Sequence, residues 1–476
     1  MSNVRVLIAM LICCRVGALA AEVKIDADYP GGNIIVQRID RDTVHLRQDL
    51  RDTKGWWFYW NFRVRGAGGR TLTFRFTNKS PIGVRGPAVS TDGGKTWAWL
   101  GSRTVKAGAK GASFRYSFPA DAAAVRFCFA VPYQDADLQR FLKRHAGSKH
   151  LVVKELCKTR KGRTVERLHV GKVSGRPTCR VLLTCRHHSC EMMASYVLEG
   201  AVAAILADTD DGRWFRRNVE VMAVPFMDKD GVEDGDQGKN RKPRDHCRDY
   251  VGKSLYPSVR ALRELAPKWS AGRLKIAIDL HCPYIRGKGN EAIYMVGSSN
   301  KDIWARQCAL AKILESVRAG PLPYKAADNL PFGKSWNKPA SYKAGKSFFQ
   351  WAEELKDIRL SSAFEIPYAS AAGKPVTSDS ARAFGADLVR AIRRYVEAMD
   401  APSNSNVQPQ SAKPTEPPPH VTALFRKRGK GDRLLFRNHS LLWAVGAMEK
   451  VACPLFRPFD CGLPAGKRTW HQGETS

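Results

Sequence analysis

The sequence predicts an α/β protein in which an antiparallel β-sandwich precedes a larger α/β domain with a mixed, mostly parallel sheet covered by helices. Three observations lead to this fold class. The first part of the chain alternates apolar and polar residues between glycine-rich turns, the middle part alternates apolar runs with helical patterns, and a Pro/Ser-rich stretch follows. Period-two alternation is typical of antiparallel strands, whereas wholly apolar strands between helices are typical of buried parallel sheets.

Length and composition are consistent with two globular units. The chain has 476 residues, of which 43% are hydrophobic, so it can bury substantial cores and is not a disordered protein. The formal net charge of +33 indicates mainly a solvated basic surface, which could also attract an acidic polymer or substrate. Lysine and arginine are spread along the chain without a zinc-finger spacing or an RNA-binding signature, so we expect no specific nucleic-acid binding.

The first 21 residues are typical of a signal peptide. Arg5 supplies a positive charge, residues 6–14 are mostly apolar, and Ala18 and Ala20 flank Leu19 as a small-residue cleavage site. The alternative is a frayed N-terminal strand. No other apolar run is long enough to cross a bilayer. We therefore expect a secreted or periplasmic protein without a transmembrane segment, with a cytoplasmic location as the alternative.

Residues 22–136 form the predicted β-sandwich domain. Aromatic and apolar residues alternate with polar ones at 57–62, 72–76 and 125–129. Such runs, bounded by glycine-rich turns, indicate short antiparallel strands.

Residues 137–400 form the predicted α/β domain. Strands are expected at 180–184, 219–225, 274–280 and 292–296, and helices at 192–206, 254–265, 303–318 and 380–398. The composition then indicates a Pro/Ser-rich linker at 401–420 and a basic tail of unknown structure at 421–476.

The turn that joins the predicted strand at 180–184 to the helix at 192–206 contains His188 and Glu191. In open α/β sheets, ligands bind at such carboxyl ends of strands. A histidine and a glutamate three residues apart in this turn can point at one ion, and their nitrogen and oxygen atoms suit zinc. The spacing alone is weakly specific, and His187 is a rival ligand.

Two further apolar strands carry a residue that could complete this site. His281 ends the run 276–281 and would give the set of two histidines and one glutamate found in catalytic zinc sites, although a single histidine in that place is more often structural. Glu365 lies in the apolar run 362–366, where an unpartnered carboxylate is costly to bury. Beside a metal-bound water, an acid–base role with a raised pKa is expected for Glu365.

The basic stretch 238–250 includes Arg241 and Arg248. A planar guanidinium matches a carboxylate with two parallel hydrogen bonds, so the stretch is predicted to bind a substrate carboxylate. The alternative is a solvated basic loop.

In their order, these motifs resemble those of the zinc carboxypeptidase family. They are H-x-x-E at 188–191, D-G at 230–231, N-R at 240–241, D-x-x-R at 245–248, D-L-H at 279–281 and the strand-borne Glu365. The likeness is greatest to the cytosolic-carboxypeptidase-like branch, in which a β-sandwich precedes the peptidase, and it extends over about residues 32–398.

The resemblance implies a zinc-dependent metallocarboxypeptidase that hydrolyses a C-terminal peptide bond and holds one Zn²⁺ per chain. Its implied zinc ligands are His188, Glu191 and His281, and Glu365 would be the base that activates the zinc-bound water.

The resemblance also implies two substrate-binding arginines. Arg241 would polarise the scissile carbonyl, and Arg248 would bind the terminal carboxylate of the substrate. The sequence departs from the family where Cys247 replaces the usual asparagine before this arginine, and where 228–231 reads D-K-D-G instead of N-P-D-G. Tyr342 is the candidate for the tyrosine that caps the substrate.

Two other functions stay open at this stage. The same apparatus could act as an amidase on peptidoglycan stem peptides or small acyl-amides, or the chain could be a non-catalytic binder of acidic polymers with a relic peptidase core. For the carboxypeptidase, the expected partner is a peptide or protein C-terminus, and the basic composition is compatible with an acidic one.

Overall fold

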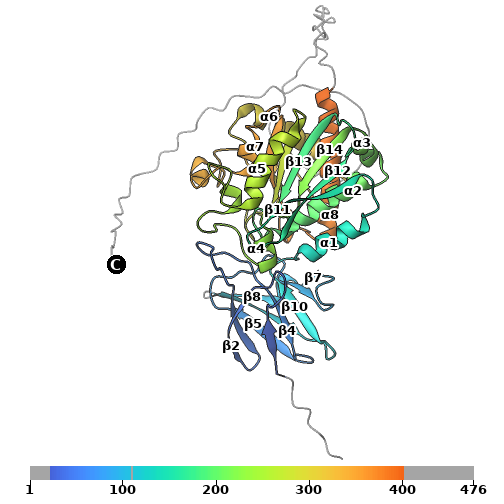
Figure 1. Ribbon diagram of the computed structural model, residues 1–476. Coiled ribbons are helices and arrows are strands. Elements are labelled where there is room, and N and C mark those ends of the chain that lie inside the picture. Colours follow the sequence, from blue (N-terminus) through green and yellow to red (C-terminus); the bar gives the residue numbers. More distant parts are fainter. Residues whose placement is uncertain (1–21, 109–110, 401–476) are drawn as a thin grey trace, which may run out of the picture. The chain divides into compact units, whose positions relative to one another are not determined.

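A computed structural model of the protein describes residues 22–108 and 111–400 (Figure 1). The predicted signal peptide, linker and basic tail lie outside these residues. Among the described residues no single helix is long and apolar enough to cross a membrane. The helices α2 (Met192–Leu206) and α3 (Asp210–Asn218) are long and apolar enough only when taken together, and the chain bends by 83° between them.

The N-terminal part contains two five-stranded sheets, ordered β1-β4-β10-β6-β7 and β2-β3-β5-β9-β8. All neighbouring strands are antiparallel except β3 and β5. Their bounds are β1 Lys24–Asp26, β2 Ile35–Asp40, β3 Thr43–Arg47, β4 Asn61–Arg65, β5 Thr71–Phe76, β6 Ala88–Ser90, β7 Ala98–Trp99, β8 Val105–Gly108, β9 Gly111–Ser117 and β10 Ala124–Cys128.

Aromatic side chains from both N-terminal sheets pack on one another. The Phe74 ring of β5 lies 5.4 Å from that of Phe62 in β4 and 5.2 Å from that of Phe127 in β10. Strands were predicted at 72–76 and 125–129, and they are present as β5 and β10. The prediction at 57–62 was wrong for residues 57–60, which precede β4 and belong to no strand.

The second part contains a seven-stranded sheet ordered β11-β12-β14-β13-β15-β17-β16. Its strands are β11 Leu151–Lys158, β12 Thr164–Gly171, β13 Cys179–Cys185, β14 Val219–Val224, β15 Leu274–His281, β16 Tyr294–Val296 and β17 Leu360–Glu365, and a small hairpin pairs β18 Ser370–Ala371 with β19 Lys374–Pro375. The sheet is mixed, as predicted. The expectation that it is mostly parallel was wrong. The central pairs β14-β13, β13-β15 and β15-β17 are parallel, whereas β11-β12, β12-β14 and β17-β16 are antiparallel.

Helices cover both faces of this sheet. They are α1 Asp135–Arg144, α2 Met192–Leu206, α3 Asp210–Asn218, α4 Lys229–Asp234, α5 Pro257–Ser270, α6 Lys301–Val317, α7 Phe348–Ala352 and α8 Ser378–Asp400, with 3-10 turns at Ser102–Thr104, His246–Arg248, Ala326–Asp328 and Pro339–Tyr342. Successive strand residues point to opposite faces, so Val181 and Leu183 pack in the core with α2 and α8, whereas Leu182 packs in the core with α5 and α7.

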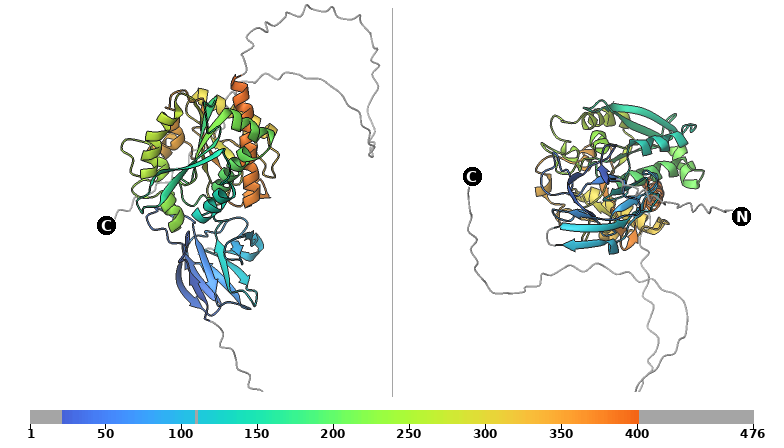
Figure 2. Two further views of the ribbon diagram at one scale, coloured as in Figure 1. Left: turned by 45° about the vertical axis from the view of Figure 1, so that its right-hand side comes forward. Right: turned by 90° about the horizontal axis from the view of Figure 1, so that it is seen from below.

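The helix α2 is apolar on nearly all sides because it lies between the sheet and α8 (Figure 2). A side chain at Gly200 of α2 would meet the backbone oxygen of Arg382 in α8 at 2.1 Å. The two helices can therefore approach closely only because glycine stands there. This packing fixes the N-terminus of α2, which follows the turn containing His188 and Glu191.

One buried glutamine joins the N-terminal part to this turn. The Gln237 side-chain oxygen accepts hydrogen bonds from the backbone N–H groups of Phe58 and Tyr59, at 3.1 and 2.8 Å, and its amide donates to Cys190 Sγ at 3.0 Å. The segment 57–60 is thus held against the residue that precedes Glu191.

We expect Gln237→Ala to lower the free energy of unfolding by about 1–3 kcal/mol, because two buried backbone N–H groups lose their acceptor. Chemical denaturation would measure the change. The matched control is Gln37→Ala, since Gln37 is exposed and accepts a bond only from Thr77. Equal stability of the two variants would contradict the role assigned to Gln237.

Candidate metal centre and substrate cavity

A cavity of about 290 Å³ lies at the carboxyl ends of the central strands. The predicted residues that line it are His188, Cys247, Arg248, His281, Tyr342 and Glu365. Because β13, β15 and β17 are parallel, their carboxyl ends meet at one edge of the sheet, and His281 is paired in register with Glu365. Residues far apart in the sequence therefore converge there.

The turn between β13 and α2 is fixed by the buried side chain of Arg186. Its guanidinium donates to the backbone oxygens of Tyr133 and Ser189 and to the hydroxyl of Ser195. Arg186 also has a positive φ of 58°, which turns the chain sharply after the strand. The sequence analysis assigned Arg186 no role. A charged residue between a buried strand and two histidines could have been predicted to stabilise the turn.

The three predicted metal ligands lie together. Glu191 accepts from both histidines: His188 Nδ1 is 3.0 Å from Oε1, and His281 Nδ1 is 2.8 Å from Oε2. One ligand atom from each residue lies within 4.8 Å of those of the other two. Two imidazole nitrogens and one carboxylate oxygen form a donor set that fits a catalytic zinc ion.

Each of the two histidines has a second carboxylate behind it. His188 Nε2 lies 3.8 Å from Asp245 Oδ2, and His281 Nε2 lies 2.5 Å from Asp279 Oδ2. Metal-bound histidines commonly donate their other ring N–H to a carboxylate, which fixes the tautomer and the orientation of the ring. The surroundings of His188 and His281 therefore fit ligands that bind through Nδ1.

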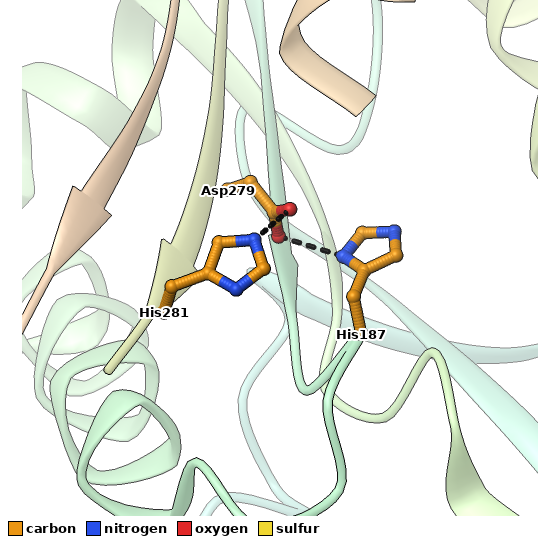
Figure 3. A group of neighbouring side chains, drawn as sticks. All are labelled: His187, Asp279 and His281. Atoms are coloured by element: carbon orange, nitrogen blue, oxygen red, sulfur yellow. Dashed lines mark hydrogen bonds and ion pairs between the residues drawn. The ribbon is translucent and has the colours of Figure 1, made fainter. Parts of the chain in front are cut away.

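A second group of possible ligands consists of His187, Asp279 and His281 (Figure 3). His187 is fully buried, and both of its ring nitrogens are occupied: Nδ1 lies 2.9 Å from Asp279 Oδ1, and Nε2 lies 2.7 Å from the hydroxyl of Tyr250. His187 does not line the cavity. Its contacts suit a residue that positions Asp279, and through Asp279 the ring of His281.

The charges of the ligand cluster are strongly coupled. Burial alone would raise the pKa of Glu191, but Lys239, His188 and His281 lower it well below its ordinary value. Burial alone would lower the pKa of His188, but Glu191 and Asp245 raise it to about 9. The Glu191 carboxylate is therefore ionised, and Lys239 and the two histidines balance its charge.

Glu365 lies at the end of β17 and lines the cavity. Only 7% of the residue is exposed, and its Oε2 has no hydrogen-bond partner among the described residues. Burial raises the pKa of Glu365, although Lys239 and His281 oppose the increase. A buried carboxylate with a free oxygen beside a metal-binding cluster has the properties of a general base.

The predicted substrate-binding residues Cys247, Arg248 and Tyr342 lie together on another side of the cavity. The Arg248 guanidinium lies 5.0 Å from the centre of the Tyr342 ring and donates to Ser341 O and Cys247 Sγ, at 3.1 and 3.3 Å. Cys247 Sγ is 3.8 Å from His281 Nε2. A cationic guanidinium this near the ligand cluster can hold an anionic group of a substrate.

Two predicted site residues, Glu191 and Arg241, do not line this cavity. Glu191 is fully buried between the two ligand histidines, whereas Arg241 lies elsewhere. Its guanidinium lies among the carboxylates of Asp52, Asp228 and Asp236, at 3.1, 3.2 and 2.6 Å. These ion pairs hold the Arg241 guanidinium away from the cavity lining, and its contact with a substrate carbonyl stays a prediction. Lys239, two residues earlier, lines the cavity instead, and sequence reasoning assigned it no role.

The chain was compared with known proteins. No family model matches it. It is 26% identical over 200 residues to cytosolic carboxypeptidase 2 of Xenopus tropicalis, covering 40% of this chain and 20% of that protein. It is 25% identical over 305 residues to cytosolic carboxypeptidase 2 of Danio rerio, covering 56% of this chain and 41% of that protein.

A solved structure gives a longer match. The metallo-carboxypeptidase from Burkholderia cenocepacia aligns with a TM-score of 0.67 and 19% identity, over 79% of this chain and all of that chain. The chain is thus similar in sequence to cytosolic carboxypeptidases and in fold to a bacterial metallo-carboxypeptidase. At this identity the structural likeness shows the metallo-carboxypeptidase fold alone. The sequence match spans about a fifth of the Xenopus protein and two fifths of the Danio protein.

The two ligand groups predict different results on substitution. We expect His188→Ala to lose stoichiometric metal because a ligand is removed, whereas His187→Gln should keep the metal with an affinity reduced about 10- to 100-fold. Metal analysis after dialysis against graded chelator, with thermal unfolding as a check on folding, would measure both. His150→Ala, outside the cavity, is the control. Loss of metal from the His187 variant alone would favour the second group.

Proposed function

We propose that the chain is a zinc-dependent metallocarboxypeptidase that hydrolyses the C-terminal peptide bond of a peptide or protein. The observation that carries this proposal is that His188 and His281, which cluster with the buried Glu191, line one cavity together with Glu365 and Arg248. The family relationship supports the same conclusion. The donor set and its carboxylate supports favour zinc over the hard cations, which prefer oxygen ligands.

The mechanism follows from these positions. Bound zinc would supply Lewis acidity and would lower the pKa of a water molecule toward neutrality. Glu365, whose Oε2 is free to accept, takes the proton of the attacking water and then delivers it to the leaving amine. His188, Glu191 and His281 hold the metal, while Asp245 and Asp279 keep the two rings in orientation.

Arg248 binds the terminal carboxylate of the substrate in this proposal. Its guanidinium is backed by the Tyr342 ring, which limits the directions in which it can donate. Cys247 stands beside it, and a thiol is a much weaker donor than the family's usual amide. Arg248 therefore provides most of the carboxylate binding, and Tyr342 closes the cavity next to it.

We further propose that residues 22–136 form a β-sandwich domain and residues 137–400 the catalytic domain. The aromatic contacts between β5 and strands β4 and β10 support the first part. For cellular location, the pattern at residues 1–21 supports export, and the cytosolic carboxypeptidase relatives support the cytoplasmic alternative. The proposed chemistry is the same in either place.

The other two functions have less support. A non-catalytic binder of acidic polymers would not need the three metal ligands, nor the unpaired Oε2 of Glu365 beside them. An amidase could use the same metal and base, but it would have no need of Arg248 in the cavity. A carboxypeptidase accounts for the ligand histidines, Glu365 and Arg248 together.

We expect Glu365→Gln to lower kcat by about a hundred- to ten-thousand-fold, because the amide cannot accept the proton. Zinc content should stay at about one per chain. N-acyl dipeptides with different C-terminal residues are suitable substrates. Glu264→Gln, a substitution on the exposed face of α5, should leave the rate unchanged. Turnover by the Glu365 variant at the wild-type rate would refute the role of the base.

A further inference from the structure

The cavity contains an ammonium group whose function the family resemblance does not supply. Lys239 Nζ lies 2.7 Å from Glu191 Oε1 and 2.6 Å from the backbone oxygen of Cys282. Its side chain is only 13% exposed, and Nζ lies 6.0 Å from the centre of the Trp57 ring. Lys239 is thus a buried cation that faces the metal ligands.

The local backbone directs Lys239 to this position. The preceding residue, Gly238, has a positive φ of 76°, and a side chain there would meet Ser189 N at 2.5 Å. The loop therefore packs directly against the turn that contains His188, and only glycine permits this approach. The residue after Gly238 is consequently delivered to the metal-binding cluster.

Arg241 cannot readily take the same role. Its guanidinium makes ion pairs with Asp52, Asp228 and Asp236, and its side chain is 9% exposed. Turning it toward the cavity would leave the buried Asp228 carboxylate without its cation, which is strongly unfavourable. The fold therefore uses Arg241 as a structural cation and leaves Lys239 and Arg248 as the lysine and arginine among the described residues lining the cavity.

We propose that Lys239 is the cation that polarises the scissile carbonyl and stabilises the oxyanion formed on water attack. This inference rests on the proposed carboxypeptidase function. An ammonium has three N–H donors, and contacts with Glu191 and Cys282 O use two of them. The third is available for a substrate oxygen. Such a donor acts most strongly in a site shielded from water.

The test combines catalysis with binding of a tetrahedral phosphonate analogue. We expect Lys239→Met to lower kcat/KM about 100- to 1,000-fold and to weaken phosphonate binding in proportion, with zinc content and product affinity unchanged. Lys239→Arg should retain part of the wild-type kcat/KM and part of the wild-type phosphonate affinity. Lys242→Met, an exposed lysine of the same loop, is the matched control.

Two results would overturn the proposal. One is unchanged phosphonate affinity in a folded, zinc-loaded Lys239→Met protein. The other is an Arg241→Gln protein that loses kcat/KM and phosphonate affinity by the same factor, while the Lys239→Met protein binds the phosphonate as tightly as the wild type. If the wild-type protein hydrolyses none of the peptides, the proposed function fails, but the comparison of phosphonate affinities still decides the role of Lys239.

A separate observation concerns the side chain of the substrate's last residue. The residues that line the cavity also include Tyr294, Val296, Trp336, Phe349 and Ala363. All five belong to or pack against one buried hydrophobic cluster, and Val296 pairs with Ala363 across β16 and β17. This part of the cavity is therefore a continuation of the core.

An acidic side chain entering this region would lose its hydration without gaining a cation. The free N–H of Lys239 is assigned to the oxygen of the scissile carbonyl, and Arg248 is needed by the terminal carboxylate. Burying an unpaired carboxylate is costly, whereas burying apolar surface is favourable. The geometry points to a substrate whose C-terminal residue is apolar or aromatic. The high positive charge of the whole chain does not determine this preference.

A panel of N-acyl dipeptides that differ only in the last residue tests this inference, which also rests on the proposed function. We expect kcat/KM for C-terminal Phe or Leu to exceed that for Glu or Lys by about 100-fold or more, since an unpaired charge is rejected. Paired phosphonates with Phe or Glu side chains should show the same order of affinity. A Glu substrate at least as good as Phe, or tighter binding of the Glu phosphonate, would overturn the inference. No hydrolysis of any peptide would contradict the carboxypeptidase function and leave the phosphonate comparison to decide.

Discussion

The site depends on one electrostatic constraint, which is the burial of the Glu191 carboxylate. Glu191 is fully buried, so its negative charge has to be balanced within the protein. His188 and His281 lie on its two oxygens, and Lys239 lies on Oε1. His188 lies in the same turn as Glu191, whereas His281 ends β15 and Lys239 lies in the loop after α4. The fold therefore has to bring three chain segments together before the charge of Glu191 can be buried.

The parallel centre of the sheet satisfies this constraint. β13 leads into the turn with His188 and Glu191, β15 ends on His281, and β17 ends on Glu365. The carboxyl ends of parallel strands share one edge, so three chain segments need no long loops to meet. This relationship made much of the site predictable. Apolar strands with a polar last residue are visible in the sequence, and their meeting follows from the parallel arrangement.

For two pairs of residues that are close in the sequence, the pattern of strands did not predict which residue enters the site. His187 and His188 are adjacent and equally plausible as ligands, and the turn at Arg186 sends one to Asp279 and the other to the cavity. Lys239 and Arg241 lie in one basic stretch. Which of them enters the cavity depends on Asp52, Asp228 and Asp236, whose proximity to Arg241 is a tertiary feature. The aromatic run at 57–60 misled for a similar reason. The backbone N–H groups of Phe58 and Tyr59 donate to Gln237, which is distant in the sequence, rather than to a neighbouring strand.

The contact at Gln237 also affects how the protein can be divided for study. Trp57 belongs to the N-terminal segment yet lines the cavity, and Gln237 ties that segment to Cys190, next to Glu191. Cutting the chain near residue 136 would remove one wall of the cavity and uncover the polar end of Gln237. A shortened catalytic fragment would thus be an altered enzyme rather than a smaller copy, and libraries or crystallisation trials should retain the first segment.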